Sequence, residues 1–123
     1  MSVNERIAVV DDDLSVCKGL TRLLRSAGYT AVAFASAEEC QESRNLDAVR
    51  CFLVDIHLGG ANGFALARKL RAEGIRAPII FMTAHEESAT SPALKEAGSP
   101  PCLAKPVESD SVLTAIARAL RTV

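Results

Sequence analysis

Four segments of the chain place carboxylate, hydroxyl or ammonium groups directly after short apolar runs. Asp11 to Asp13 follow the first such run, and Asp55, Thr83 and Lys105 follow three later ones. Two carboxylates about 4 Å apart repel each other by about 4 kcal/mol at an effective dielectric constant near 20. A divalent cation would offset that repulsion, and Mg2+ takes carboxylate, water and phosphate oxygens as ligands. The acidic residues therefore indicate a hard-cation site.

The other polar side chains of the set suit chemistry on phosphorus. The carboxylate of Asp55 can attack a phosphorus atom and form an acyl phosphate. The hydroxyl of Thr83 can donate a hydrogen bond to a phosphoryl oxygen, and the ammonium of Lys105 supplies a positive charge to a phosphate. Such groups catalyse phosphoryl transfer by positioning and charge neutralisation.

Five short apolar runs along the chain have the length and composition of buried strands. They are RIAVV (6–10), AVAFA (31–35), CFLVDI (51–56), PIIFM (78–82) and PCLA (101–104). Apolar residues with helical spacing lie between them and after the last, and they predict five helices. The second helix is predicted to start at the capping box formed by Ser36 and Glu39. The other four helices are predicted from apolar stripes, which are Val16, Leu20, Leu23 and Ala27; Leu66, Ala67 and Leu70; Leu94 and Ala97; and Val112, Leu113, Ile116, Ala117 and Leu120.

Capping residues and glycines predict where these helices begin and end. Asp13 is predicted to be the N-cap of the first helix rather than a metal ligand, and Gly28 its C-cap. Gly74 and Gly98 are expected to end the third and fourth helices. The glycines at 59, 60 and 63 are expected to form a flexible turn rather than a phosphate-cradling loop.

Regular alternation of strand and helix predicts an α/β domain with a parallel sheet covered by helices on both faces. In such sheets ligands bind outside the carboxyl ends of the strands. The four polar segments all follow strands, so we expect them to converge at one edge of the sheet. The 123 residues, 49% of them hydrophobic, suffice for one core, and residues 1–123 are expected to form a single domain.

Composition excludes several other functions. A net charge of -1 does not favour direct nucleic-acid binding, which usually needs a basic face. No apolar run reaches the length of a membrane span, and the polar start predicts no signal peptide. The four cysteines are widely spaced, which predicts reduced, mostly buried thiols in a cytoplasmic protein and disfavours a zinc site.

The motifs VVDDD (9–13), LVDIHLGGANG (53–63), IIFMTAH (79–85) and LAKP (103–106) together resemble the receiver domain of two-component response regulators. The resemblance extends from Arg6 to Leu120. It implies a flavodoxin-like (βα)5 three-layer sandwich whose five-stranded parallel sheet has the order 2-1-3-4-5. It further implies a signalling switch in a phosphorelay, which is not an enzyme beyond its own phosphorylation and dephosphorylation.

The resemblance assigns the acidic residues. Asp55 would be the phospho-acceptor, receiving its phosphoryl group from a sensor histidine kinase or a phosphotransfer protein. Asp11 and Asp12 would form an acidic pair around Mg2+. Asp12 and Asp55 would be direct ligands, and the backbone carbonyl of His57 would be another.

The resemblance also assigns the switch residues. Thr83 would follow the phosphoryl group, and Lys105 would contact a phosphate oxygen. The bond between Lys105 and Pro106 would be cis, which costs little before proline. His57 and His85, each two residues beyond a site residue, would tune the lifetime of the phosphoryl group or lie at the rim.

Three features depart from the family pattern, and all fall on its usual output surface. Cys102 stands where receivers usually carry Tyr or Phe, so the rotating aromatic residue is missing. Pro100 and Pro101 stiffen the preceding segment. Pro92 suggests a late start of the fourth helix, with Ser91 as N-cap, after a mobile loop over 84–90. We therefore expect an atypical output to an unknown partner.

Other interpretations remain open from the sequence. VVDDD also reads as the opening motif of a haloacid-dehalogenase-like phosphatase, with Asp11 as nucleophile and Asp13 as general acid. An FMN-binding flavodoxin is disfavoured by the repulsion between the carboxylates and a cofactor phosphate. A receiver that works as a phosphate-independent binding module is a third interpretation. The resemblance also allows a homodimer, and leaves open whether a further domain follows.

Overall fold

The core of the protein is one sheet of five parallel strands. The computed structural model describes residues 5–85, 92–96 and 100–121. The sheet order is β2-β1-β3-β6-β7, which is the predicted order 2-1-3-4-5 when only the strands of this sheet are counted. Its members are β1 (Arg6–Val10), β2 (Thr30–Phe34), β3 (Val49–Asp55), β6 (Ile79–Thr83) and β7 (Cys102–Ala104). The predicted flavodoxin-like α/β fold is therefore confirmed.

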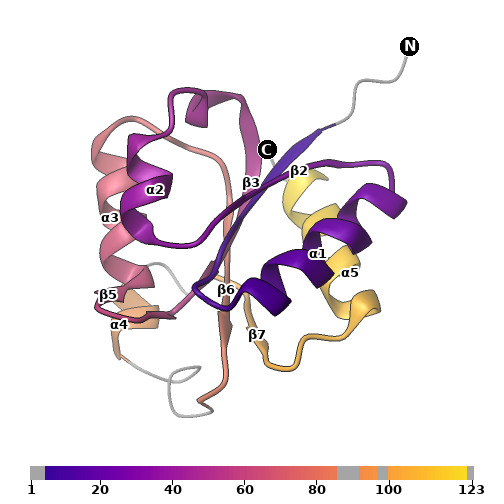
Figure 1. Ribbon diagram of the computed structural model, residues 1–123. Helices are drawn as coiled ribbons and strands as arrows, with labels where there is room; N and C mark the ends of the chain where they lie inside the picture. Colours follow the sequence, from indigo (N-terminus) through magenta and orange to yellow (C-terminus); the bar gives the residue numbers. More distant parts are fainter. Residues whose placement is uncertain (1–4, 86–91, 97–99, 122–123) are drawn as a thin grey trace.

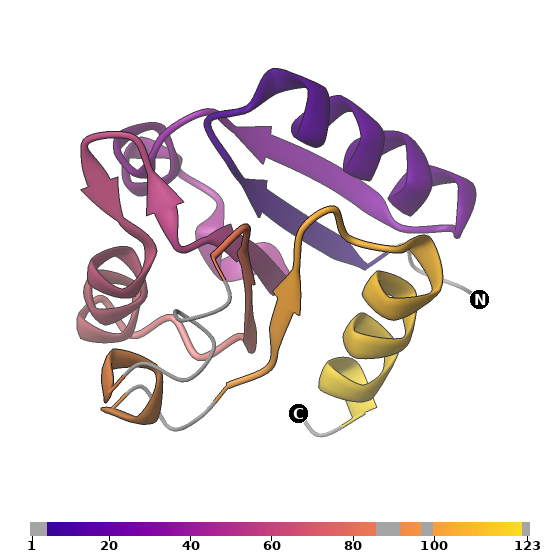
Figure 2. The same ribbon diagram turned by 90° about the horizontal axis from the view of Figure 1, so that it is seen from below.

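Helices cover the sheet on both faces and complete three layers (Figure 1 and Figure 2). On one face lie α1 (Leu14–Ser26) and α5 (Ser109–Arg121). On the other lie α2 (Ala37–Glu42), α3 (Gly63–Ala72) and the short α4 (Pro92–Glu96). A 3-10 turn, η1 (Leu46–Ala48), leads into β3.

Each central strand divides its side chains between the two helical layers. In β1, Ile7 and Val9 pack toward α1 and α5, while Ala8 and Val10 pack toward α2 and α3. β3 and β6 alternate in the same way, as the strand period of two requires. Burial on both faces explains why these strands are uninterrupted apolar runs.

The predicted helix starts are confirmed at α1 and α2. The side chain of Asp13 accepts a hydrogen bond of 2.9 Å from the amide of Ser15. The side chain of Ser36 accepts one of 3.1 Å from the third residue beyond it. The C-terminus of α1 differs by one position, because Ala27 is the C-cap and Gly28 follows at a φ of 95°. A positive φ is easily adopted only by glycine.

The predicted turn after β3 is confirmed at Gly59 and Gly60, whereas Gly63 is the first residue of α3. Two short strands, β4 (His57–Leu58) and β5 (Ala61–Asn62), pair antiparallel and make a hairpin. Gly59 lies in its two-residue loop at a φ of 63°. The side chain of Asn62 then accepts a hydrogen bond of 2.7 Å from the amide of Phe64 and caps α3.

α4 begins at Pro92 in the described chain. The predicted Ser91 cap, the end of this helix at Ala97 and Gly98, and most of the predicted loop over 84–90 lie outside the described residues. Within the described part of the chain, no helix combines the length and the apolar character needed to cross a membrane.

All four cysteines are free thiols, as predicted. Three are buried and Cys102 is half-buried. Burial raises the pKa of Cys40 to about 11 and that of Cys51 to about 12. These two thiols therefore stay protonated at neutral pH and act as small core residues.

Candidate functional site

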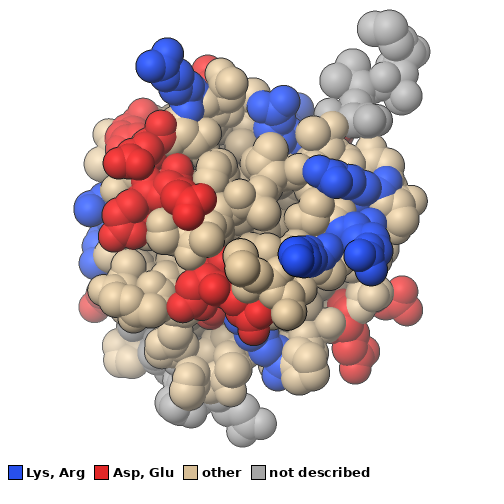
Figure 3. All heavy atoms as spheres, in the orientation of Figure 1, with Lys and Arg blue, Asp and Glu red and all other residues tan. Residues whose placement is uncertain are grey.

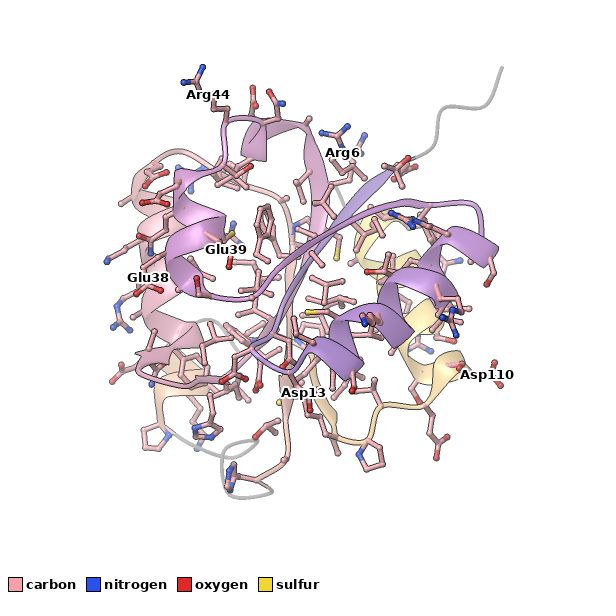
Figure 4. The ribbon with its side chains drawn as sticks, viewed as in Figure 1. Arg6, Asp13, Glu38, Glu39, Arg44 and Asp110 are labelled. Carbon is pink, nitrogen blue, oxygen red and sulfur yellow. The ribbon has the colours of Figure 1, made fainter. Side chains whose placement is uncertain are left out.

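The predicted site residues follow four neighbouring strands at their carboxyl ends. Asp11 comes directly after β1, Asp55 and Thr83 are the last residues of β3 and β6, and Lys105 follows β7. Figure 4 shows this end of the sheet: Asp13, next to the site, lies at the opposite end from Arg6 and Arg44. The parallel order of the strands is thus what brings residues almost 100 positions apart to one edge.

Three carboxylates and one lysine form the centre of the site. Asp11, Asp12 and Asp55 each place a carboxylate oxygen within 4.8 Å of the other two. The ammonium Nζ of Lys105 lies 2.6 Å from Oδ2 of Asp11 and 2.9 Å from Oδ2 of Asp55. Asp11 is fully buried and Asp55 is 5% exposed, while Asp12 is exposed. The sequence indicated a cation as the partner of these carboxylates, and the structure shows that Lys105 is one such partner.

The donor set fits a divalent cation. Three carboxylates against one ammonium leave two negative charges in the site. All the acidic ligand atoms are oxygens, which suit Mg2+ better than softer metals. The exposed carboxylate of Asp12 opens the group to solvent, so an ion can reach it and keep part of its water shell.

Main-chain hydrogen bonds fix the orientation of the two buried carboxylates. Oδ1 of Asp55 accepts a bond of 3.1 Å from the amide of His57. Oδ1 of Asp11 accepts one of 2.9 Å from the amide of Asp13. The thiol of Cys17 in α1 donates to the carbonyl oxygen of Asp11 at 3.2 Å. The acidic segment is therefore held from both β1 and α1.

Burial and hydrogen bonding have opposite effects on the pKa values of Asp55 and Lys105. Burial raises the pKa of Asp55, and the hydrogen bonds from Lys105 and from the amide of His57 oppose that rise without cancelling it. Burial also acts to lower the pKa of Lys105, but its hydrogen bonds to Asp11 and Asp55 outweigh burial and the net pKa is raised. Lys105 is therefore charged at neutral pH.

The raised pKa of Asp55 predicts how Mg2+ binding depends on pH. The folded state holds this proton more tightly than the unfolded state, so the carboxyl contributes less to stability as pH rises from 3.8 through its folded pKa. Over the same window the carboxyl group of Asp55 loses its proton, so the affinity of the acidic group for Mg2+ should rise with pH. Calorimetric titration with Mg2+ at several pH values measures this. Equal Mg2+ affinity across this pH window would contradict a role of Asp55 in holding the ion. The control is Asp47→Asn, at an exposed site, which should keep the same dependence of Mg2+ affinity on pH.

Thr83 and the two histidines lie beside the carboxylates. Thr83 is buried, and its hydroxyl is hydrogen-bonded to the main chain of His85. The imidazole rings of His57 and His85 are in contact, with centroids 4.5 Å apart. The amide of Lys105 donates to the carbonyl of Thr83 at 2.7 Å. The Lys105–Pro106 peptide bond is cis.

Cys102 lies outside this group of contacts. It is the first residue of β7 and pairs in register with Phe81 of β6. Its half-buried side chain packs against the core layer of α2 and α3. A thiol is smaller than an aromatic ring, so this position does not offer the rotating aromatic group that the family pattern would place here.

Gly63 supports the site in a way that sequence reasoning missed. Its amide donates to the carbonyl of Ile56 at 2.8 Å. A Cβ atom here would clash with the carbonyl oxygen of Asp55 and lie 3.0 Å from Cα of Ile56. Only glycine lets α3 start this close to the end of β3. Asn62, a good N-cap residue just before it, was the signal in the sequence that a helix begins here.

Comparison with known proteins places the chain in a family. Residues 7–117 match the family described as "Response regulator receiver domain". The chain belongs to this receiver family. Nodulation protein W of Bradyrhizobium diazoefficiens is 34% identical over 113 residues, which cover 92% of this chain and 50% of that protein. Response regulator protein TodT of Pseudomonas putida is 30% identical over 115 residues, covering 94% of this chain and 51% of that protein.

Solved receiver structures share the fold. The response regulator StyR has a TM-score of 0.87 at 35% identity, covering 98% of this chain and 61% of that chain. A CheY-like receiver domain protein from Methanospirillum hungatei has a TM-score of 0.86 at 24% identity, covering 98% of this chain and 96% of that chain. The chain spans about half the length of the two curated relatives.

Membership in the receiver family determines the class of function. The chain is a phospho-accepting signalling domain with an acidic pocket of Asp11, Asp12 and Asp55, and it is not a classical enzyme. A receiver implies a cognate histidine kinase. The phosphatase interpretation is wrong, and the structure gives a reason: Asp13, its general acid, accepts hydrogen bonds as the N-cap of α1. The flavodoxin interpretation is likewise excluded by the family match.

Proposed function

We propose that Asp55 accepts a phosphoryl group from a phosphohistidine of a sensor histidine kinase or a phosphotransfer protein, in a reaction that needs Mg2+. The observation that carries this proposal is the group of three carboxylates closed by Lys105 at the carboxyl ends of the central strands. Asp55 is the acceptor because it ends the central strand β3 between the acidic segment and Lys105. Residues 1–123 would form this one receiver domain.

In the proposed step a carboxylate oxygen of Asp55 attacks phosphorus, an O–P bond forms and the N–P bond of the phosphohistidine breaks. The electron pair of that bond returns to the imidazole of the donor. Lys105 shifts its ammonium from the carboxylate to a phosphoryl oxygen, and the hydroxyl of Thr83 donates a hydrogen bond to another. Asp12, Asp55 and the backbone carbonyl of His57 would hold Mg2+, with Asp11 beside them. The ion would neutralise negative charge on the phosphoryl group.

Incubation with acetyl phosphate tests the proposal without the unidentified kinase. We expect intact-mass analysis to show one phosphoryl group per chain with Mg2+ and none when the ion is chelated. Absence of labelling in both conditions would contradict the proposal. It would favour the phosphate-independent binding module, which the small side chain at Cys102 keeps open.

The surface beside the site offers a place for the phosphohistidine donor. Leu14, in the first turn of α1, is 64% exposed, the one large hydrophobic residue with such exposure among the described residues. Leu14 lies on the side of α1 that carries Lys18 and Thr21. On the other side of this helix, a groove of about 630 Å³ opens between α1 and the segment before α5. Its walls are mostly apolar and its end reaches the site, with Val16, Leu20, Leu23, Pro106 and Val107 along it and Asp13 and Lys105 at the site. We propose that the donor docks over the first turn of α1 and covers both Leu14 and the site end of this groove.

The charge around this surface suggests the character of the donor. Lys and Arg side chains gather over α1, and Asp and Glu over α2 (Figure 3). The exposed basic residues of α1 are Lys18, Arg22 and Arg25. A donor that presents acidic side chains around its phosphohistidine would complement α1 and be repelled by α2.

Leu14→Glu should weaken phosphotransfer from a phosphohistidine protein by about tenfold or more, because it removes apolar contact and repels an acidic donor. Labelling by acetyl phosphate should not change, since this small donor needs no docking surface. The rates are compared by intact mass, with a purified phosphotransfer protein that phosphorylates the wild-type chain as the protein donor. Ala48→Glu, exposed at the opposite end of the sheet, is the matched control. Equal loss with both phosphoryl donors would contradict the docking role of Leu14.

The output of this receiver is proposed to be atypical. Cys102 replaces an aromatic residue, Pro100 and Pro101 precede it, and the described α4 has five residues. These features lie on the face where an output partner or a second copy in a homodimer would bind. The domain is proposed to act in the cytoplasm without binding nucleic acid itself.

A further inference from the structure

A continuous set of contacts joins Asp55 to Thr83 through two histidines. The amide of His57 donates to Oδ1 of Asp55 at 3.1 Å. The amide of His85 donates to Oγ1 of Thr83 at 3.0 Å. The imidazole rings of the two residues meet at a centroid distance of 4.5 Å and an interplanar angle of 69°. The two ring-bearing residues, which we call the histidine pair, thus connect the hairpin after β3 with the end of β6.

The hydroxyl of Thr83 is already engaged in this arrangement. It is buried, with 2% of the residue exposed, and it donates to the carbonyl of His85 at 3.2 Å. A hydroxyl has a single proton to donate. If Thr83 donates to a phosphoryl oxygen, it must therefore release the carbonyl of His85.

The contacts of the histidine pair oppose the loss of the hydrogen bond between the hydroxyl of Thr83 and the carbonyl of His85. The main chain of His85 is held on one side by Thr83, while its ring is held by the ring of His57. His57 is in turn bonded to the carboxylate that would become phosphorylated. Rotation of Thr83 would break its hydrogen bonds to the main chain of His85, and modification of Asp55 would alter the carboxylate that accepts the bond from the amide of His57.

We infer that the histidine pair positions Thr83 in its unphosphorylated arrangement, and that the ring contact opens when Asp55 is phosphorylated. This inference rests on the proposed function, because it takes Asp55 as the acceptor. His57 and His85 are positioning residues, since they act through the hydroxyl of Thr83. The pair gives this receiver a conformational response that does not require an aromatic residue at Cys102.

The test compares His85→Ala, which removes the ring, with His85→Phe, which keeps a ring but no nitrogen. Both changes are at an exposed residue, so the fold should persist. Beryllium trifluoride with Mg2+ serves as the phosphoryl mimic, and its affinity is measured by calorimetry. We expect His85→Ala to bind the mimic about two- to tenfold more tightly, which is the range for an aromatic pair. His85→Phe should bind it as the wild type does.

A second readout follows the free protein. In nuclear magnetic resonance spectra without the mimic, the resonances of Thr83 should shift in His85→Ala and stay in place in His85→Phe. Unchanged affinity and unchanged Thr83 resonances in His85→Ala would overturn the inference. Identical behaviour of the two variants would also overturn it, because the imidazole nitrogen and not the ring contact would then matter. If the wild type fails to bind the mimic while His85→Ala still shifts Thr83, the proposed function fails and the positioning role stands.

Discussion

Asp55→Asn should reduce phosphoryl incorporation from acetyl phosphate to background, a loss of several orders of magnitude. An amide oxygen is a far weaker nucleophile than a carboxylate, and no acyl phosphate can form on it. The fold should persist. Burial raises the pKa of Asp55 and its charge is repelled by that of Asp11, so a neutral side chain of the same shape removes an unfavourable charge. Mg2+ affinity should fall as well, because one of three clustered carboxylates is lost.

The measurement is intact mass after incubation with acetyl phosphate and Mg2+, together with calorimetric titration by Mg2+. Asp47→Asn makes the same chemical change at an exposed carboxylate away from the site and should behave as the wild type. Persistent labelling of Asp55→Asn would show that another residue is the acceptor. Asp11 would be the first to examine, although it is fully buried.

Gly63→Ala should lower the free energy of unfolding by about 1–3 kcal/mol, the usual cost of adding an atom to a packed region. The upper part of that range is expected, because the added Cβ would meet main-chain atoms, the carbonyl oxygen of Asp55 first among them. Backbone cannot swing aside as a flexible side chain can. Since the residue that must shift is Asp55, phosphoryl incorporation should fall together with stability.

Gly60→Ala is the matched control for this change. Gly60 lies in the hairpin loop shortly before α3, and a Cβ there would meet no atom within 4 Å. Its free energy of unfolding should stay within about 0.5 kcal/mol of the wild type. Urea denaturation followed by circular dichroism gives both values. Equal stability of the two variants would contradict the close approach of α3 to the end of β3.

The strands and the residues that follow them could be predicted because both faces of the sheet are buried. Ile7, Leu53 and Ile80 belong to uninterrupted apolar runs, and the first polar residue after each run marks the end of a strand. Once the sheet is parallel, all of those ends share one edge. The positions of Asp11, Asp55, Thr83 and Lys105 follow from this rule.

The hairpin between β3 and α3 could not be predicted in the same way. Its strands have two residues each, too few to show the alternation that identifies a strand. The requirement for glycine at Gly63 comes from a contact with Asp55, and spacing in the sequence does not contain such a contact. For the same reason, the link from His57 to His85 and Thr83 was visible only once the ends of β3 and β6 were side by side.

The ion pair between Lys105 and Asp11 could not be predicted from the sequence either. The family resemblance assigned Lys105 to a phosphate oxygen, while the structure places its ammonium between two carboxylates. Charge balance explains the difference. Buried carboxylates need a cationic partner before any phosphoryl group arrives, and Lys105 supplies it.

The identity of the phosphorylated residue decides whether Asp55 is the phospho-acceptor. After labelling with acetyl phosphate and Mg2+, reduction with borohydride converts an aspartyl phosphate into homoserine, which peptide mass analysis locates. We expect homoserine at position 55 and unmodified aspartates at positions 11 to 13. Homoserine at position 11, or labelling without any aspartyl phosphate, would contradict this role of Asp55.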